Sequence, residues 1–234
     1  MVNWLMISFL LSIVSYILVD QVSSSTSYCN VDSCPYNSHT MCKYRSPTYS
    51  SWCGNRRYIK SGLTRNEVLE LVRVHNHLRA FVASGKERRG SPGPQPRAKN
   101  IGPLVWNNEL AIVAQRWANQ CVFGHDQCRN LAQFKVGQNI AFSSTSTVFP
   151  NNLTSIVLQW YDEVADFNRH LVNKLQFTTA RVYHYTQMVW AETKQVGCGC
   201  TRYKKNNYWY TTHLVCNYGP TGNVIGRPVY EINK

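Results

Sequence analysis

The chain has 234 residues, of which 44% are hydrophobic, and its formal net charge is +13. The length suits one sizeable core rather than two, and the apolar content excludes an intrinsically disordered chain. Thirteen basic residues and only three glutamates lie between Lys43 and Lys99, so residues 43–99 are expected to bind polyanions such as sulfated glycans or anionic lipid. Solubility of a secreted protein is the plainer explanation of the charge, and it outweighs a specific nucleic-acid function.

The N-terminal segment predicts export. Residues 1–19 are apolar and carry no charge before Asp20, and the small polar run SSST follows. We interpret residues 1–27 as a signal peptide and the processed chain as extracellular, without a transmembrane segment. The alternative is a membrane anchor, because the apolar length is borderline for spanning a bilayer.

Cysteine usage indicates an oxidising compartment, because a reducing cytosol would leave so many thiols unpaired. Zinc is the rival explanation, but the run from Cys29 to Cys53 lacks a C-x-x-C pair, which favours disulfides. The total of nine is odd, so one thiol is left over. The cysteines are Cys29, Cys34, Cys42, Cys53, Cys121, Cys128, Cys198, Cys200 and Cys216.

The first part of the mature chain divides into an arm and a helix. Residues 28–62 have no regular period and predict a loop-rich arm tied by cysteines. Thr64 and Glu67 then form a capping box that begins a helix, and Gly85 ends it. One face of this helix is apolar and includes a histidine that we interpret as a core residue. That face contains Val68, Leu71, Val72, His75, Leu78 and Val82.

The remainder of the chain mixes helices with strands. A loop rich in proline and glycine follows the first helix at 90–100. Periodicity then predicts helices over 107–121, 154–167 and 185–193. Alternation predicts strands over 137–142, 195–203 and 208–219, the last two forming a β-hairpin. Helices and strands around one core indicate a layered α/β/α domain.

Four separated stretches resemble one protein superfamily. They are HNHLR (75–79), WANQCVFGHDQC (117–128), VGQNIAF (136–142), and HYTQMVWAETKQVGCG with CNYGPTGN (184–223). They resemble the cysteine-rich secretory, antigen 5 and pathogenesis-related superfamily. The cysteine-rich arm and the loop GSPGPQPRAKN are similar to insect antigen 5, the venom and salivary allergens. The resemblance covers the arm, residues 28–62, and a superfamily domain that we expect at residues 63–234.

The resemblance implies an α+β fold, a three-layer α-β-α sandwich with a disulfide-rich N-terminal arm and a central cleft. The family cleft carries two histidines and two acidic residues. His125 and His184 match the histidines, and Glu163 matches one acidic residue. The other acidic position falls on Gln138, so this chain has one ionisable group fewer.

The chemistry of these residue types can be weighed without the family. Two imidazoles are natural ligands of a divalent metal such as Zn²⁺, and a carboxylate such as Glu163 can orient an imidazole or act as a base. Catalytic zinc sites usually have three protein ligands, however, and a glutamine cannot transfer protons. We therefore expect no required cofactor, and weak binding of Zn²⁺ or another divalent metal at His125 and His184.

Three functions stay open at this point. The first is a secreted, non-enzymatic binding or effector protein of the antigen 5 type, an allergen that binds a host protein, lipid or small molecule. The second is a metal-dependent hydrolase that uses His125, His184 and Glu163, and the third is a lipid or sterol carrier. Gln138 and the presence of only two cleft histidines disfavour the hydrolase.

Similarity to antigen 5 also implies the disulfide pairing, which is Cys29–Cys42, Cys34–Cys128, Cys53–Cys121 and Cys198–Cys216. In a strand Cys198 and Cys200 point to the same face, so either could approach Cys216, and the assignment depends on the GCG match. Cys200 is then the free thiol, either buried as a small apolar residue or exposed and able to link two otherwise monomeric chains. Separately, the sequon Asn152-Leu153-Thr154 predicts glycosylation at Asn152.

Overall fold

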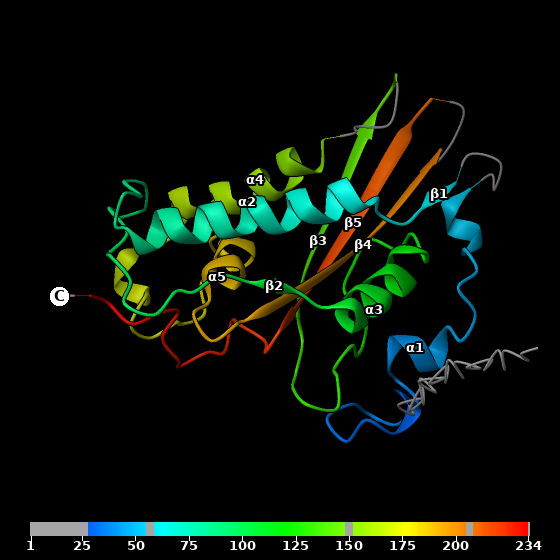
Figure 1. The fold of residues 1–234 in the computed structure, drawn as a ribbon, viewed down its shortest axis with the longest axis horizontal. Coiled ribbons are helices and arrows are strands. Elements are labelled where there is room, and N and C mark those ends of the chain that lie inside the picture. Colours follow the sequence, from blue (N-terminus) through cyan, green and yellow to red (C-terminus); the bar gives the residue numbers. More distant parts are fainter. Residues whose placement is uncertain (1–27, 55–58, 148–151, 205–207, 234) are drawn as a thin grey trace, which may run out of the picture.

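The computed structural model describes residues 28–54, 59–147, 152–204 and 208–233, so the expected signal peptide lies outside the described residues. A five-stranded sheet forms its centre (Figure 1). β4 (Gln195–Lys204) and β5 (Tyr210–Gly219) pair antiparallel, and β3 (Gly137–Thr145) pairs antiparallel with β5 and forms one edge. The two-residue strands β1 (Lys60–Ser61) and β2 (Val105–Trp106) both pair with β4.

Helices cover both faces of this sheet (Figure 1). α3 (Asn108–Ala118) packs on one face, while α2 (Arg65–Ala83), α4 (Leu153–Asp162) and α5 (Tyr183–Val189) pack on the other. Strand alternation divides neighbouring residues between these layers, so that Val215 packs with α3 and Cys216 joins the opposite core. The result is the α-β-α sandwich that the resemblance implies.

Short turns of helix complete the chain. α1 (Thr40–Lys43) and the 3₁₀ turns η1 (Tyr28–Asn30) and η2 (Ser51–Cys53) lie in the arm. The 3₁₀ turns η4 (Glu163–Asp166) and η5 (Arg169–Leu171) follow α4. The helix expected over 154–167 therefore changes to a tighter turn after Asp162, and the one expected over 185–193 is shorter and starts earlier. No helix in the described ranges has the length and apolar character needed to cross a lipid bilayer.

The start of α2 follows its sequence signal. Thr64 Oγ1 accepts from the backbone N–H of Glu67, and the Glu67 carboxylate accepts from the backbone N–H of Thr64 at 2.7 Å. The expected apolar face needs a correction, because Val68 and Val72 are only partly buried, whereas Val74 and Arg79 are fully buried. Because α2 contacts α4 and α5, its buried stripe is rotated toward those helices.

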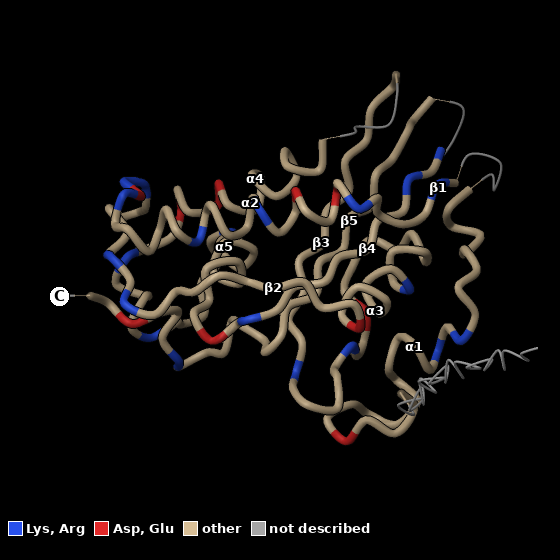
Figure 2. The backbone as a smooth tube through the Cα atoms, viewed as in Figure 1, with Lys and Arg blue, Asp and Glu red and all other residues tan. Residues whose placement is uncertain are grey.

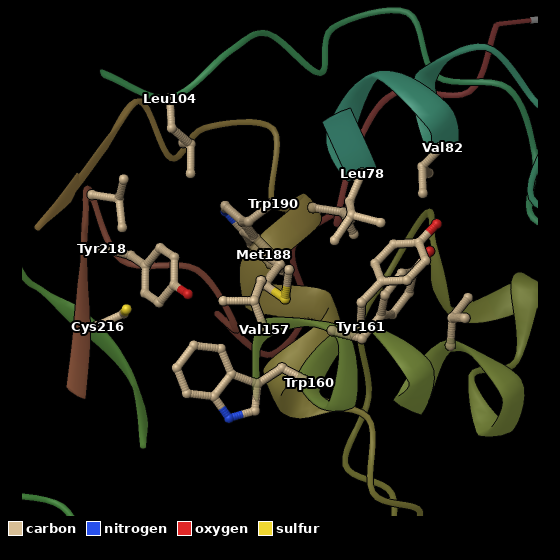
Figure 3. Close-up of a cluster of buried hydrophobic side chains, with 14 of the residues drawn as sticks. Leu78, Val82, Leu104, Val157, Trp160, Tyr161, Met188, Trp190, Cys216 and Tyr218 are labelled. Carbon is tan, nitrogen blue, oxygen red and sulfur yellow. The ribbon is translucent and has the colours of Figure 1, made fainter. Parts of the chain in front are cut away.

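The main core lies between the sheet and the helices α2, α4 and α5 (Figure 3). Trp160 and Tyr161 of α4 meet Met188 and Trp190 from α5 and its C-terminal end, and all four are at most 3% exposed. The α4 positions expected to face inward, Ile156, Val157, Trp160 and Val164, are all buried. This packing fixes the helices that carry Glu163 and His184.

Disulfides tie the arm to this domain. The structure contains the bridges Cys29–Cys42, Cys34–Cys128, Cys53–Cys121 and Cys198–Cys216, which are the pairs that the resemblance implies. Two of them join the arm to the segment after α3, and each such bridge typically stabilises a fold by about 2–4 kcal/mol. Cys200 is the free thiol and is 0% exposed. Burial also raises its pKa to about 12. Of the two alternatives, the structure shows Cys200 buried as a small apolar residue.

Candidate functional site

The four cleft residues expected from the motifs come from separate elements. His125 lies in the loop after α3, and Gln138 lies on the edge strand β3. Glu163 lies where α4 passes into η4, and His184 lies in the first turn of α5. The structure pairs His125 with Gln138 and His184 with Glu163, and His184 lies near enough to affect the electrostatics of His125. That all four residues line one cleft stays a prediction.

Glu163 holds His184 and the start of its helix. Its Oε1 accepts from His184 Nδ1 at 2.6 Å, and its Oε2 accepts from the backbone N–H groups of His184 at 2.9 Å and Tyr185 at 3.2 Å. Val182, the residue before α5, has no side-chain cap of its own. Glu163 therefore caps α5 from outside the helix, and the Trp160 ring stacks on the His184 ring at 6.0 Å between centroids.

Gln138 holds His125 in a similar way. The Gln138 Oε1 atom accepts from His125 Nδ1 at 2.7 Å, while its Nε2 donates to Asn217 Oδ1 at 3.0 Å. Because the amide donates on one side, its oxygen must face the histidine, which places the imidazole proton on Nδ1. Asn217 in turn donates to the backbone oxygen of Leu110 in α3 at 3.3 Å.

Electrostatics keep His125 neutral. Desolvation by the surrounding protein lowers its pKa and the charge of Arg129 lowers it further, while the hydrogen bond to Gln138 and the charge of Asp126 oppose the shift. Both imidazoles use Nδ1 for the bond to their supporting side chain. This leaves the Nε2 atom of each ring for an external ligand, and no hydrogen bond joins either atom to another of the described residues.

The candidate residues do not by themselves supply a complete set of metal ligands. Within the described ranges, no group of three or more His, Cys, Asp and Glu side chains is placed to hold a metal ion. A divalent ion at this cleft would have two nitrogen ligands from the chain and would complete its coordination with water. That His125 and His184 lie within reach of one ion stays a prediction.

A buried polar network behind the cleft was missed by sequence reasoning. Asn139 Nδ2 donates to the backbone oxygen of His184 at 3.1 Å and to Tyr218 Oη at 3.3 Å. The Tyr218 hydroxyl also bonds His75 Nε2 at 2.9 Å. The motifs GQN and CNYG contain residues of this network. Their contacts depend on the pairing of β3 with β5, which places Gln138 opposite Asn217.

Two further expectations stay predictions. Asn152 is exposed and caps α4, with its Oδ1 accepting from the Ser155 N–H at 3.4 Å, so glycosylation there is untested. The described basic residues of 43–99 are spread over separate parts of the molecule (Figure 2), and Arg56 and Arg57 lie outside the described residues. Arg73 pairs with Glu70 at 2.7 Å and Arg79 is buried. Neither side chain is therefore expected to contribute much to binding a polyanion.

Comparisons with known proteins cover both the arm and the domain. The family model described as the cysteine-rich secretory protein family (CAP) matches residues 72–218. Venom allergen 5 of Dolichovespula arenaria is 49% identical over 205 residues, covering 88% of this chain and 98% of the relative. Venom allergen 3 of Solenopsis invicta is 48% identical over 215 residues, covering 90% and 91%.

Solved structures share the fold. The crystal structure of NaASP2 with Zn²⁺ superposes with a TM-score of 0.60 at 31% identity, covering 74% of this chain and 89% of that one. The structure of BmVAL-1 gives a TM-score of 0.63 at 30% identity, covering 77% and 86%.

Proposed function

The chain belongs to the cysteine-rich secretory protein (CAP) family as a secreted antigen 5-like protein, and from this membership we propose that it is a non-enzymatic effector that binds its targets. The targets proposed are a host protein, a lipid or another small molecule. The cleft then serves as a binding site that holds a divalent metal weakly, and it does not carry out hydrolysis.

The observation that carries this proposal is the engagement of Glu163, the one carboxylate among the four candidate residues. Glu163 accepts three hydrogen bonds, two of them from backbone N–H groups at the start of α5. A carboxylate that took a proton from water would have to give up part of that cap. Gln138, at the position of the second acidic residue, is an amide and cannot act as an acid or base.

The two free Nε2 positions support a metal in this cleft. Neutral imidazole is a good zinc ligand, and its orientation is fixed when the other ring nitrogen is hydrogen-bonded, as both are here. The relative NaASP2 was crystallised with Zn²⁺. A bound ion would supply positive charge to the cleft, and two protein ligands predict an affinity well below that of a structural zinc site.

Calorimetry with Zn²⁺ tests this arrangement. We expect a weak binding heat that is lost in both His125→Ala and His184→Ala and weakens as the pH falls, because protonated imidazole cannot bind metal. His170→Ala is the matched control, since His170 is an exposed histidine in η5. Tight binding that does not change with pH, or binding that survives both cleft variants, would contradict the proposal.

A further inference from the structure

A hollow lined by aromatic residues lies on the α3 face of the sheet, beside the arm. It has a volume of about 550 Å³, which falls within the range of roughly 300–1,000 Å³ typical of small-molecule sites. We call it the aromatic groove and define it by Trp52, Val122, Phe123, Phe142 and Tyr203, with Ser144 and Thr211 at its rim.

The arm and the domain build this groove together. Trp52 comes from η2 in the arm, and Val122 and Phe123 follow α3. The Cys53–Cys121 bridge joins the neighbours of these two walls, and both sulfurs are buried. Phe142 of β3 and Tyr203 of β4 form the sheet side, where they cluster with the same bridge. The disulfide therefore fixes the distance between the walls.

Two of the walls present aromatic rings to water. Trp52 is 74% exposed and Phe123 is 85% exposed. Single exposed apolar residues are ordinary, but here both side chains line one concave site. The Phe123 ring lies 5.3 Å from the Phe142 ring, and Phe142 stacks on His213 at 3.9 Å. A flat ring entering the groove would meet aromatic surface that is already held in place.

The described residues that line the groove carry no charge. The Ser144 and Thr211 hydroxyls at the rim bond each other at 2.9 Å. Behind Phe142, burial lowers the pKa of His213 to about 4, so this imidazole is neutral at physiological pH. Without an ion to pair a charged ligand, the contacts on offer are ring stacking and apolar burial.

We propose that the aromatic groove binds a neutral, flat aromatic small molecule between Trp52 and Phe123. This site lies apart from the histidine cleft, because none of the four cleft residues lines the groove. The inference therefore does not depend on the proposed metal binding. It gives the arm a role in ligand binding as well as in stability.

The test is a titration with N-phenyl-1-naphthylamine, a neutral, flat aromatic probe that fluoresces in apolar sites. We expect saturable binding to the disulfide-bonded protein, weakened at least tenfold in Phe123→Ala and in Trp52→Ala. The matched control is Phe177→Ala, since Phe177 is 84% exposed but does not line the groove, and it should bind the probe like the unchanged protein.

Two results would overturn the proposal. One is the absence of saturable binding to the unchanged protein. The other is equal binding by Phe123→Ala and Phe177→Ala. Near-ultraviolet circular dichroism checks that each variant is folded, and the two independent groove variants keep the test decisive if one of them misfolds. Zn²⁺ calorimetry should be the same in all three variants, which separates this site from the cleft.

Discussion

At the scale of single residues, buried histidines carry a stability cost that depends on pH. His75 and His213 are both 0% exposed. Burial lowers the pKa of each from 6.5 to about 4. Each bonds a backbone carbonyl, of Leu71 and Ala118 respectively, so the ring is neutral and donates from Nδ1. These residues pack inside the protein and are separate from the cleft.

The sign of the pH effect follows from these pKa values. The unfolded chain takes up the proton near pH 6.5, whereas folded His75 does so only near pH 4. Stability from neutral His75 is therefore fully present above pH 6.5 and is lost as the pH falls from 6.5 to 4. The expected loss is on the order of 3 kcal/mol for each such histidine.

Urea unfolding at pH 7 and pH 4.5 measures this loss. His75→Gln should reduce the pH dependence, because glutamine keeps polar atoms for Tyr218 but does not titrate. His77→Gln, on the exposed face of the same helix, is the control and should leave the dependence unchanged. If the two variants show the same difference between the two pH values, the assignment to His75 is wrong.

Residue roles were predictable from the sequence only in part. The period of α2 placed His75 in the core, and the structure buries it. Gln138 and Glu163 could be named from motifs, but their functions as supports for His125 and for α5 required three-dimensional contacts. The role of Asn217 could not be predicted from the motif CNYG alone, because its contact with Gln138 depends on how β3 pairs with β5.

At the scale of elements, one buried arginine joins α2 to the end of α5. Arg79 is 1% exposed and donates to the backbone oxygens of Gly102, Met188, Trp190 and Thr193 at 2.7–3.2 Å. Burial lowers its pKa to about 10, so the guanidinium stays charged at pH 7. It supplies donors to carbonyls that the end of a helix leaves unpaired, while Glu163 caps the other end.

Replacing Arg79 should therefore loosen the helix that carries His184. Arg79→Met removes a donor from four backbone oxygens, of which that of Trp190 keeps the N–H of Thr193 at 3.3 Å. Each buried carbonyl left without a donor costs about 1–3 kcal/mol. We expect a loss of at least about 3 kcal/mol in the free energy of unfolding, measured by urea denaturation at pH 7. Arg73→Met is the control, because Arg73 is exposed on the same helix and pairs only with Glu70.

A small effect of Arg79→Met, similar to that of Arg73→Met, would show that other contacts hold α5.

The sequence could not predict the contact of Arg79 with the end of α5. The apolar face predicted for α2 does not include Arg79, and an arginine is rarely buried. The long elements were predictable from caps and periodicity, whereas β1 and β2 have two residues each and exist only through pairing with β4.

At the scale of the whole molecule, the fold separates the basic residues but brings the cysteines together. The described basic residues of 43–99 lie on separate parts of the backbone (Figure 2). Arg89 pairs with Glu87 at 2.9 Å and with Asp162 at 2.7 Å. The cysteines, in contrast, converge, because Cys34 and Cys53 reach Cys128 and Cys121 at the end of one helix. The fold class and the disulfide pairs could be inferred from the resemblance, but the spatial distribution of the basic residues could not.

We propose that the cleft binds its target without catalysing hydrolysis. The decisive measurement is an assay of the purified, disulfide-bonded protein with peptide and ester substrates, with and without a chelator, alongside His184→Ala. We expect no turnover above background, and no difference between the unchanged protein and His184→Ala. Turnover that the chelator suppresses and His184→Ala abolishes would contradict this proposal and establish a metal-dependent hydrolase.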